Sequence, residues 1–160
     1  MIETERKFLV QSDTFKQEAE TAEHIIQGFL NTHPERTVRI RITDDFGYLT
    51  IKGLTGKSGA SRFEWEREIP VKEARHLLLL CEKGFIEKTR YRIRAGDHIV
   101  EVDEFHGDND GLVIAEIELN DEYEPFEKPV WLGKEVTGDI RYYNSQLSIN
   151  PFKTWKKEER

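Results

Sequence analysis

Short segments in which charged and apolar residues alternate recur along most of this chain, and they constrain its fold more than any other feature. Side chains of a β-strand point alternately to opposite faces. In "VRIRI", residues 38–42, this rule puts the apolar side chains on one face and Arg39 and Arg41 on the other. Eight such segments are predicted as strands: 2–9, 24–30, 37–43, 47–52, 62–69, 87–94, 98–105 and 112–119.

Short turn sequences join these segments. "DDFG" at 44–47 and "RAGD" at 94–97 are typical of antiparallel hairpins. Three helices are expected, at 12–22, at 71–83 and from about 139 to Pro151. The fold class is therefore α+β and mostly β, with an antiparallel sheet of eight strands that is strongly curved or closed. A length of 160 residues predicts a single domain, residues 1–160.

The charged faces are sorted by sign from one expected strand to the next. The acidic positions include Glu64, Glu66, Glu101, Asp103, Glu116 and Glu118, the basic positions include Arg39, Arg41, Lys88 and Arg90, and the first strand places Glu3, Glu5 and Lys7 together. A sheet with one solvated face is the common alternative, but such a face usually mixes charges with neutral polar residues. Like charges two residues apart repel each other by about 1 kcal/mol or less in water, and a surface gains nothing by repeating that arrangement.

If the sheet closes, its charged face becomes a lumen and its apolar face is covered by helices. Carboxylate oxygens suit hard divalent cations such as Mg²⁺ and Mn²⁺, and arginine and lysine suit phosphate oxygens. A lumen with charges of both signs therefore predicts a metal-bound polyanion as its ligand. On the residues alone, this lumen and the solvated sheet face both stay open.

Other classes of function are disfavoured. The sequence GKS at 56–58 resembles the end of a P-loop, but a P-loop needs a glycine five residues earlier, where this chain has Ile51. Residues 53–60 are instead predicted as a hairpin connection. A formal charge of −7 argues against nucleic acid as a partner. No apolar run is long enough to span a membrane, and the single cysteine, Cys81, fits a reducing cytoplasm.

The opening Glu3-Thr4-Glu5-Arg6-Lys7 matches the ExExK signature of the CYTH superfamily, the triphosphate tunnel metalloenzymes. Further segments resemble that family in the same order: "QGFL" at 27–30, "VRIRI" at 38–42, "TIKG" at 50–53, "RFEWE" at 62–66, "KTRYRI" at 88–93, "VEVDEF" at 100–105, "AEIEL" at 115–119 and "WLGKEVTGDIRYYN" at 131–144. ExExK alone is a weak signal because acidic strands produce it by chance. Ordered matches over essentially the whole chain are specific, and they resemble the short, bacterial, tripolyphosphatase-like members.

The resemblance implies a closed eight-stranded antiparallel barrel with a few helices packed outside, whose tunnel hydrolyses a triphosphate with Mg²⁺ or Mn²⁺. It implies that divalent metal binds to Glu3, Glu5, Glu116 and Glu118. It implies that triphosphate oxygens are held by Lys7, Arg39, Arg41, Lys52, Lys88 and Arg90, with Lys134 and Arg141 as candidates for the tunnel mouth. The acids that would line the tunnel, and hold a second metal or orient the attacking water, are Glu64, Glu66, Glu101 and Asp103.

Hydrolysis of inorganic tripolyphosphate, with nucleoside triphosphates as a further substrate class, is the leading hypothesis. Thiamine triphosphatase and class IV adenylate cyclase, from the same superfamily, are alternatives, and a non-catalytic polyphosphate- or nucleotide-binding module is an alternative of another class. Family members of this short architecture often carry tyrosine where this chain has Phe29, so the preferred substrate depends on whether a hydroxyl is needed there. A small-molecule triphosphate is the expected partner, and a homodimer is a further expectation.

Overall fold

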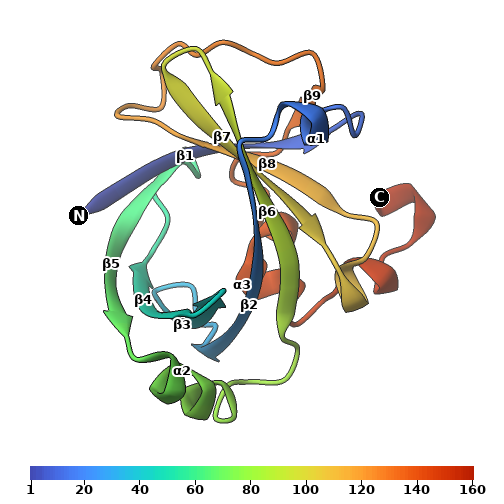
Figure 1. The fold of residues 1–160 in the computed structure, drawn as a ribbon. Helices are drawn as coiled ribbons and strands as arrows, with labels where there is room; N and C mark the ends of the chain where they lie inside the picture. Colours follow the sequence, from blue (N-terminus) through green and yellow to red (C-terminus); the bar gives the residue numbers. More distant parts are fainter.

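The alternating segments form one antiparallel sheet that closes on itself. The computed structural model describes residues 1–160. Its strands are β1 (Ile2–Val10), β2 (Thr21–Asn31), β3 (Arg36–Thr43), β4 (Phe46–Gly53), β5 (Ser61–Ile69), β6 (Ile86–Ala95), β7 (His98–Phe105), β8 (Val113–Glu118) and β9 (Leu132–Glu135). The order around the sheet is β5-β4-β3-β2-β6-β7-β8-β1, and β1 pairs with β5 again. All eight expected strands are present, and the predicted closed barrel is confirmed (Figure 1).

Strand β1 closes the barrel by dividing one of its edges between two partners. Its first residues pair with β5, with Ile2 opposite Phe63. Its last residues pair on that edge with β9, where Val10 lies opposite Leu132, while β8 follows the other edge. Strand β9 is not predicted from the sequence because its four residues, "LGKE", carry no alternating pattern.

The helices are shorter than expected. They are α1 (Phe15–Glu18), α2 (Val71–Leu78) and α3 (Asn144–Leu147), and short 3₁₀ segments lie at Gly107–Asn109, Ile140–Tyr142, Phe152–Thr154 and Lys157–Glu159. The helix expected at 12–22 is wrong at its end because Thr21 already belongs to β2, opposite Arg92. The helix expected at 71–83 ends early in turns bonded over three residues, such as Leu79 N–H to His76 O. None of these helices combines the length and apolarity that crossing a membrane requires.

Two helices cover the outside of the barrel, as predicted. A buried cluster joins Phe15 of α1 and Trp131 to the apolar outward residues of β6, β7, β8 and β1, including Val102 and Ile117. Trp131 is held there by its indole N–H, which donates to Glu18 at 3.0 Å. On the other side α2 packs on β3 and β4. At Gly47 an added Cβ would come within 2.7 Å of the Ala74 Cβ, so glycine permits this close approach.

The third helical segment corrects the prediction that all helices pack outside. Phe29, Phe105 and Ile114 have the strand parity of the inward-facing residues, and they form a second buried cluster with Leu147 and Trp155 from the C-terminal segment. This segment, residues 136–155, therefore closes one end of the barrel, and we call it the plug. Side chains from β2 and β6, Gln27 and Lys88, donate to Asn144 at its centre. In Figure 1, α3 accordingly lies near β2 and β6.

The loop after α2 touches the plug so closely that only glycine fits. Gly84 has φ +98°, and a Cβ there would lie 1.8 Å from the carbonyl oxygen of Ser148. We predict that Gly84→Ala lowers the free energy of unfolding by about 2 kcal/mol or more, since left-handed backbone strain and overpacking add. Urea denaturation would measure the loss.

The matched control is Gly107→Ala. Gly107 also has a positive φ, +62°, but a Cβ there would meet nothing within 4 Å. Backbone strain alone predicts a loss of about 1 kcal/mol. Equal losses in the two variants would contradict a specific contact between Gly84 and the plug.

Candidate active site

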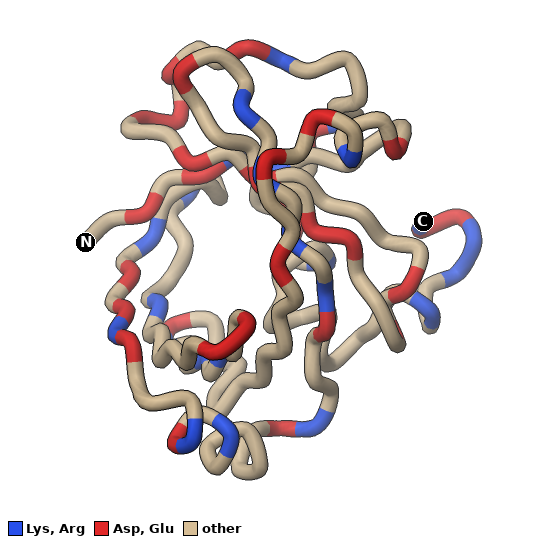
Figure 2. The backbone as a smooth tube through the Cα atoms, in the orientation of Figure 1, with Lys and Arg blue, Asp and Glu red and all other residues tan.

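A charged cavity of about 260 Å³ occupies the lumen of the barrel, so the solvated-face alternative is wrong. Figure 2 shows acidic and basic segments around the opening. Eight bases and seven acids line the cavity, with only two apolar or aromatic residues among 21. The bases are Lys7, Arg39, Arg41, Lys52, Arg62, Lys88, Arg90 and Arg92, and the acids are Glu3, Glu5, Glu64, Glu66, Glu101, Glu116 and Glu118.

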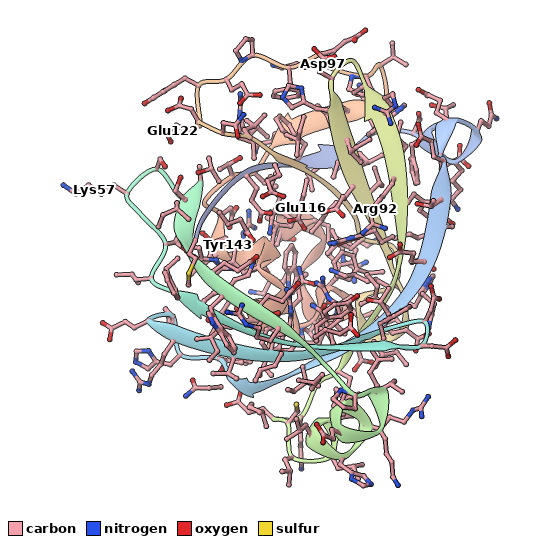
Figure 3. The ribbon with its side chains drawn as sticks, turned by 60° about the vertical axis from the view of Figure 1, so that its left-hand side comes forward. Lys57, Arg92, Asp97, Glu116, Glu122 and Tyr143 are labelled. Carbon is pink, nitrogen blue, oxygen red and sulfur yellow. The ribbon has the colours of Figure 1, made fainter.

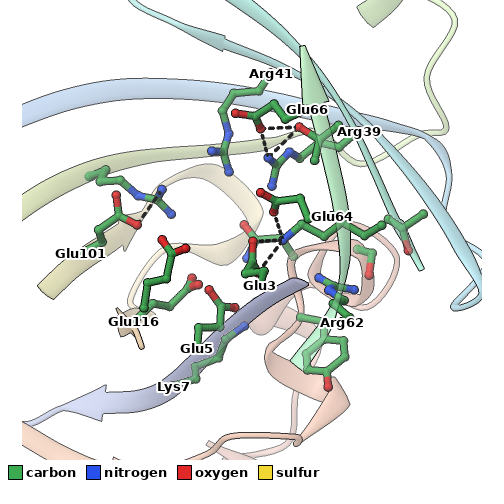
Figure 4. A pocket seen from close by; sticks show the side chains of 18 of the residues that line it. Glu3, Glu5, Lys7, Arg39, Arg41, Arg62, Glu64, Glu66, Glu101 and Glu116 are labelled. Atoms are coloured by element: carbon green, nitrogen blue, oxygen red, sulfur yellow. Dashed lines mark hydrogen bonds and ion pairs between the residues drawn. The ribbon is translucent and has the colours of Figure 1, made fainter. Parts of the chain in front are cut away.

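On the wall formed by β1, β3, β4 and β5, acids and bases from different strands pair with one another. The ammonium of Lys52 lies 3.0 Å from Glu3 and 3.1 Å from Glu64. Arg39 lies 3.2 Å from Glu66, which also accepts a hydrogen bond from the Thr50 hydroxyl (Figure 4). The strand register causes these contacts because it sets Lys52 opposite Glu64, and Thr50 opposite Glu66.

Asp103 forms the most deeply buried ion cluster. It accepts two hydrogen bonds from Arg90, at 2.8 and 2.9 Å, and its second oxygen lies 2.7 Å from Lys88. Burial would raise the pKa of Asp103, but Arg90 and Lys88 outweigh it and lower that pKa to about 2. Burial lowers the pKa of Lys88 to about 7 although Asp103 opposes the shift. Asp103 was expected to line the tunnel; instead it lies behind Lys88 and Arg90 and fixes them.

Glu101 and Arg92 extend this pairing toward the end of the barrel opposite the plug. Glu101 lies 3.3 Å from Arg90 and 3.2 Å from Arg92. Arg92 also pairs with Glu23 of β2. Glu101 therefore lines the cavity as predicted, with both neighbouring arginines engaged.

Three acids on β1 and β8 have no basic partner within ion-pair distance. They are Glu5, Glu116 and Glu118, and Glu5 lies directly opposite Glu118 in the strand register. Burial, followed by the charges of Glu116 and Glu3, holds the pKa of Glu5 well above its usual range. Burial, Glu3 and Glu101 likewise raise the pKa of Glu118. The more distant charges of Lys7, Arg90 and Lys88 nevertheless hold the pKa of Glu116 well below its usual range against burial, and no three acids converge on one point as a ready-made metal site.

Three bases are the counterpart, since they have no acidic partner within ion-pair distance. Lys7 donates to the carbonyl oxygen of Tyr142 at 3.3 Å. Arg41 donates through Nε to Gln27 at 2.8 Å, and burial with the nearby charges of Arg39 and Arg90 lowers its pKa to about 9. Arg62 lies over the ring of Tyr143, 5.6 Å from its centre. The guanidinium groups of Arg41 and Arg62 are therefore available to an anion in the cavity.

Several residues that line the cavity are not among the site residues predicted from the sequence. Arg62 opens "RFEWE" with the parity of Glu64 and Glu66, so the alternation itself could have identified it. The plug residues Tyr143, Asn144 and Ser145 also line the cavity, and no sequence pattern announces them. Figure 3 shows Tyr143, Arg92 and Glu116 near the cavity, whereas Lys57, Asp97 and Glu122 lie outside it.

Lys134 and Arg141 are not brought to the tunnel, which corrects their expected place at its mouth. Arg141 donates to Asp139, at 2.7 Å from Nη2, and stacks over Trp155 on the outside of the plug. Lys134 is exposed on β9, beyond the closing pair of β1 and β5. Phe29, by contrast, does line the cavity and packs against the apolar end of the plug.

Comparison with known proteins agrees with this geometry. A family model described as the CYTH domain matches residues 1–146. An inorganic triphosphatase from Acetivibrio thermocellus is 50% identical over 156 residues, covering 97% of this chain and 98% of that protein. An inorganic triphosphatase from Nitrosomonas europaea is 35% identical over 153 residues, covering 94% of this chain and 99% of that protein.

Solved structures share the barrel. The crystal structure of the inorganic triphosphatase NE1496 has a TM-score of 0.65 and 32% identity, covering 91% of this chain and 97% of that chain. The PH1012 protein from Pyrococcus horikoshii OT3 has a TM-score of 0.60 at 18% identity, covering 75% of this chain and 80% of that chain, a likeness of fold alone. With the family model spanning residues 1–146 and two full-length relatives above 30% identity, this chain belongs to the CYTH family.

Proposed function

We propose that this protein is a divalent-metal-dependent triphosphatase whose principal substrate is inorganic tripolyphosphate. The observation that carries the proposal is the segregation of unpaired charges within one cavity. Glu5, Glu116 and Glu118 lie on β1 and β8 and have no base within ion-pair distance. Arg41 and Arg62 lie on β3 and β5 and have no acid within ion-pair distance. A bound cation and a bound polyanion together satisfy both sets. The two inorganic triphosphatases to which the chain is similar over nearly their whole length support the same reaction.

The metal would be held by Glu3, Glu5, Glu116 and Glu118. The donor set fits Mg²⁺ or Mn²⁺ because it consists of carboxylate oxygens only. The raised pKa of Glu5, caused by burial and then by Glu116 and Glu3, shows a local excess of negative charge that a divalent cation would relieve. When bound, such a cation neutralises charge on the phosphoryl oxygens.

The triphosphate would lie between the metal carboxylates and the basic wall. We assign its oxygens to the predicted phosphate-binding residues that line the cavity, which are Lys7, Arg39, Arg41, Lys52, Lys88 and Arg90. Arg62, which also lines the cavity, joins this set. Phosphoryl transfer depends chiefly on positioning and on charge stabilisation in the transition state. Arg90 and Lys88 suit this task because Asp103 fixes both before substrate binds.

Hydrolysis needs one water molecule and no covalent intermediate. The water oxygen forms a bond to a terminal phosphorus, the bond from that phosphorus to the bridging oxygen breaks, and pyrophosphate leaves with the bond's electron pair. One proton of the water passes to a tunnel carboxylate and the other stays on orthophosphate. Glu64, Glu66 and Glu101 are the candidates for orienting this water. Asp103 is not, since its oxygens already accept from Arg90 and Lys88.

The lining of the cavity favours a substrate without an organic group. Only Phe29 and Tyr143 among its 21 lining residues present apolar surface, whereas a thiamine or nucleoside group calls for an apolar pocket with a few oriented polar groups. Tripolyphosphate is therefore ranked above thiamine triphosphate and ATP. Phosphate release from the three compounds with Mg²⁺, Mn²⁺ or EDTA tests this ranking, and cyclic AMP formed from ATP would instead identify a cyclase.

The remaining expectations stay predictions. A single domain over residues 1–160 is supported by the plug, because Trp155 packs into the end of the barrel beyond the segment that matches the family model. A cytoplasmic location is supported by the single, partly buried Cys81. The acidic net charge disfavours nucleic acid as a partner, and sizing by light scattering would test the homodimer.

Replacing Glu5 by glutamine should change enzymatic activity and thermal stability in opposite directions. We predict that Glu5→Gln lowers metal-dependent phosphate release from tripolyphosphate by about 100-fold or more, because a metal ligand is lost. The same change should raise the Tm in EDTA by a few degrees, since it removes a buried charge that Glu116 and Glu3 repel. A phosphate assay and thermal unfolding measure the two effects.

Glu87→Gln is the matched control. Glu87 lies on β6 with an exposed side chain that contacts His24 on the outside of the barrel. Neither activity nor Tm should change appreciably in this variant. Full activity of Glu5→Gln would sink the assignment of the metal site.

Substrate binding should depend on the protonation of Lys88. Asp103, Arg90, Arg41 and Glu116 are the charged groups that face it, and burial lowers its pKa to about 7. A bound polyanion favours the protonated form, so the affinity is fully present below pH 7 and is lost as the pH rises through 7. We predict that the Kd for tripolyphosphate in EDTA rises between pH 6 and pH 8.5. The rise should be about tenfold larger than in a variant with a permanent positive charge at position 88.

The permanent charge is supplied by Lys88→Arg, because arginine stays protonated across this range. Calorimetric titrations of both proteins between pH 6 and pH 8.5 give the comparison. The ionisation of tripolyphosphate changes Kd equally in both proteins, so the difference between their pH dependences reports on Lys88 alone. Identical pH dependence in the two proteins would show that Lys88 does not titrate in this range.

A further inference from the structure

The tunnel has a narrow side passage at its plugged end. A small cavity of about 20 Å³ shares two bases and two acids with the tunnel, Lys7, Arg62, Glu3 and Glu5, as well as Tyr143. It also shares Thr55 and Gly138 with a third cavity, outside the barrel. The passage therefore runs between the hairpin connection 53–60 and the first residues of the plug, and its volume is about that of one water molecule.

The outer cavity is a basin of about 420 Å³ that carries no acid. Lys57 is its one charged residue, and the hydroxyls of Thr55, Ser58 and Thr137 contribute polar surface. The GKS sequence at 56–58, which is not a P-loop, thus forms one wall of this basin. The cavity of about 390 Å³ at the opposite opening of the tunnel carries charges of both signs, with Glu23, Asp44 and Glu66 beside Arg41, Arg90 and Arg92.

Tyr143 lines the passage, and its ring makes two cation–π contacts. The ammonium of Lys7 lies 5.2 Å from the centre of the Tyr143 ring, and the guanidinium of Arg62 lies 5.6 Å from the same centre. Such cation–π contacts contribute about 0.5–2 kcal/mol each. The Tyr143 hydroxyl makes no hydrogen bond to the rest of the protein, so a rotation of the ring breaks no hydrogen bond.

We propose that this basin is the exit for orthophosphate and that the Tyr143 ring is the gate. The proposal rests on the proposed hydrolysis of tripolyphosphate. A phosphate split off at the plugged end lies beside Lys7 and Arg62, the two residues that contact the gate. When an anion engages these cations, their attraction for the ring weakens, so an anion at the plugged end itself loosens the gate.

The second product favours this route over return through the open end. Pyrophosphate still occupies the tunnel between the plugged end and the opening when orthophosphate forms. Beyond it, an anion would meet three acids and three bases, whereas beyond the passage the basin carries Lys57 as its one charge. Like-charge repulsion in a low-dielectric channel is much larger than in water, and it disfavours a return of orthophosphate past pyrophosphate.

A reversible block of the passage tests the proposal. Thr55→Cys in a Cys81→Ala background gives one thiol at the narrow point, since Cys81 is the chain's only cysteine. A bulky, uncharged methanethiosulfonate reagent is attached to the folded protein and later removed with dithiothreitol. Chemical quench follows cleavage of tripolyphosphate with Mg²⁺, and stopped flow with a fluorescent phosphate sensor follows release.

We expect the labelled protein to cleave its first substrate at the unlabelled rate, while phosphate release slows by at least about fivefold and recovers after reduction. Asp97→Cys in the same background is the matched control, because Asp97 lies in the exposed turn between β6 and β7, and its label should change neither rate. Release that keeps pace with cleavage in the labelled Thr55→Cys protein would overturn the exit. Slowed cleavage would overturn it too, by placing the label in the chemical step. Absence of cleavage in the unlabelled protein would instead refute the proposed function.

Discussion

The structure depends on the cost of placing many charges inside a protein. Burying a single unpaired ion is prohibitively expensive, so buried charges are paired, bind ions or lose their charge. This tunnel uses all three solutions. Asp103 is paired with Arg90 and Lys88. Burial lowers the pKa of Lys88 to about 7, so it is near the point of losing its charge. Burial and the charges of Glu116 and Glu3 hold the pKa of Glu5 well above its usual range, and a bound cation would offset those charges.

Closure of the barrel makes this charge arrangement possible, and β1 is the strand on which closure depends. Its two ends pair with β5 and β9 on one edge, and β8 pairs along the other. Since side chains alternate between faces, a slip of one residue would move Glu3, Glu5 and Lys7 outside and bring Thr4, Arg6 and Phe8 into the lumen. The apolar cluster around Trp131 outside the barrel opposes such a slip. The outer core therefore fixes the register that the charged lumen itself could not hold.

The period of two predicted the strands, the closed sheet and most of the lining, because alternation is a local property of the chain. Pairing is not local. Arg62 and Arg92 belong to the alternation, yet which bases meet an acid depends on register between strands far apart in sequence. The plug escaped prediction for a similar reason. Its helix α3 has four residues and gains its stability from tertiary contacts around Leu147 rather than from helical propensity.

The plug also explains how a barrel of this kind can be both stable and charged inside. Along β7 and β8 the inward positions change from Glu101 and Glu116 to Phe105 and Ile114. The apolar end buries Leu147 and Trp155 and so adds a second core, while the charged end stays open to water and ligand. Strain and unpaired charge at a functional site are tolerated when the surrounding structure supplies the stability. Phe29 sits at this boundary, lining the cavity and packing into the plug at once. A phenyl ring there extends the apolar core, whereas a hydroxyl would bring a polar group against it.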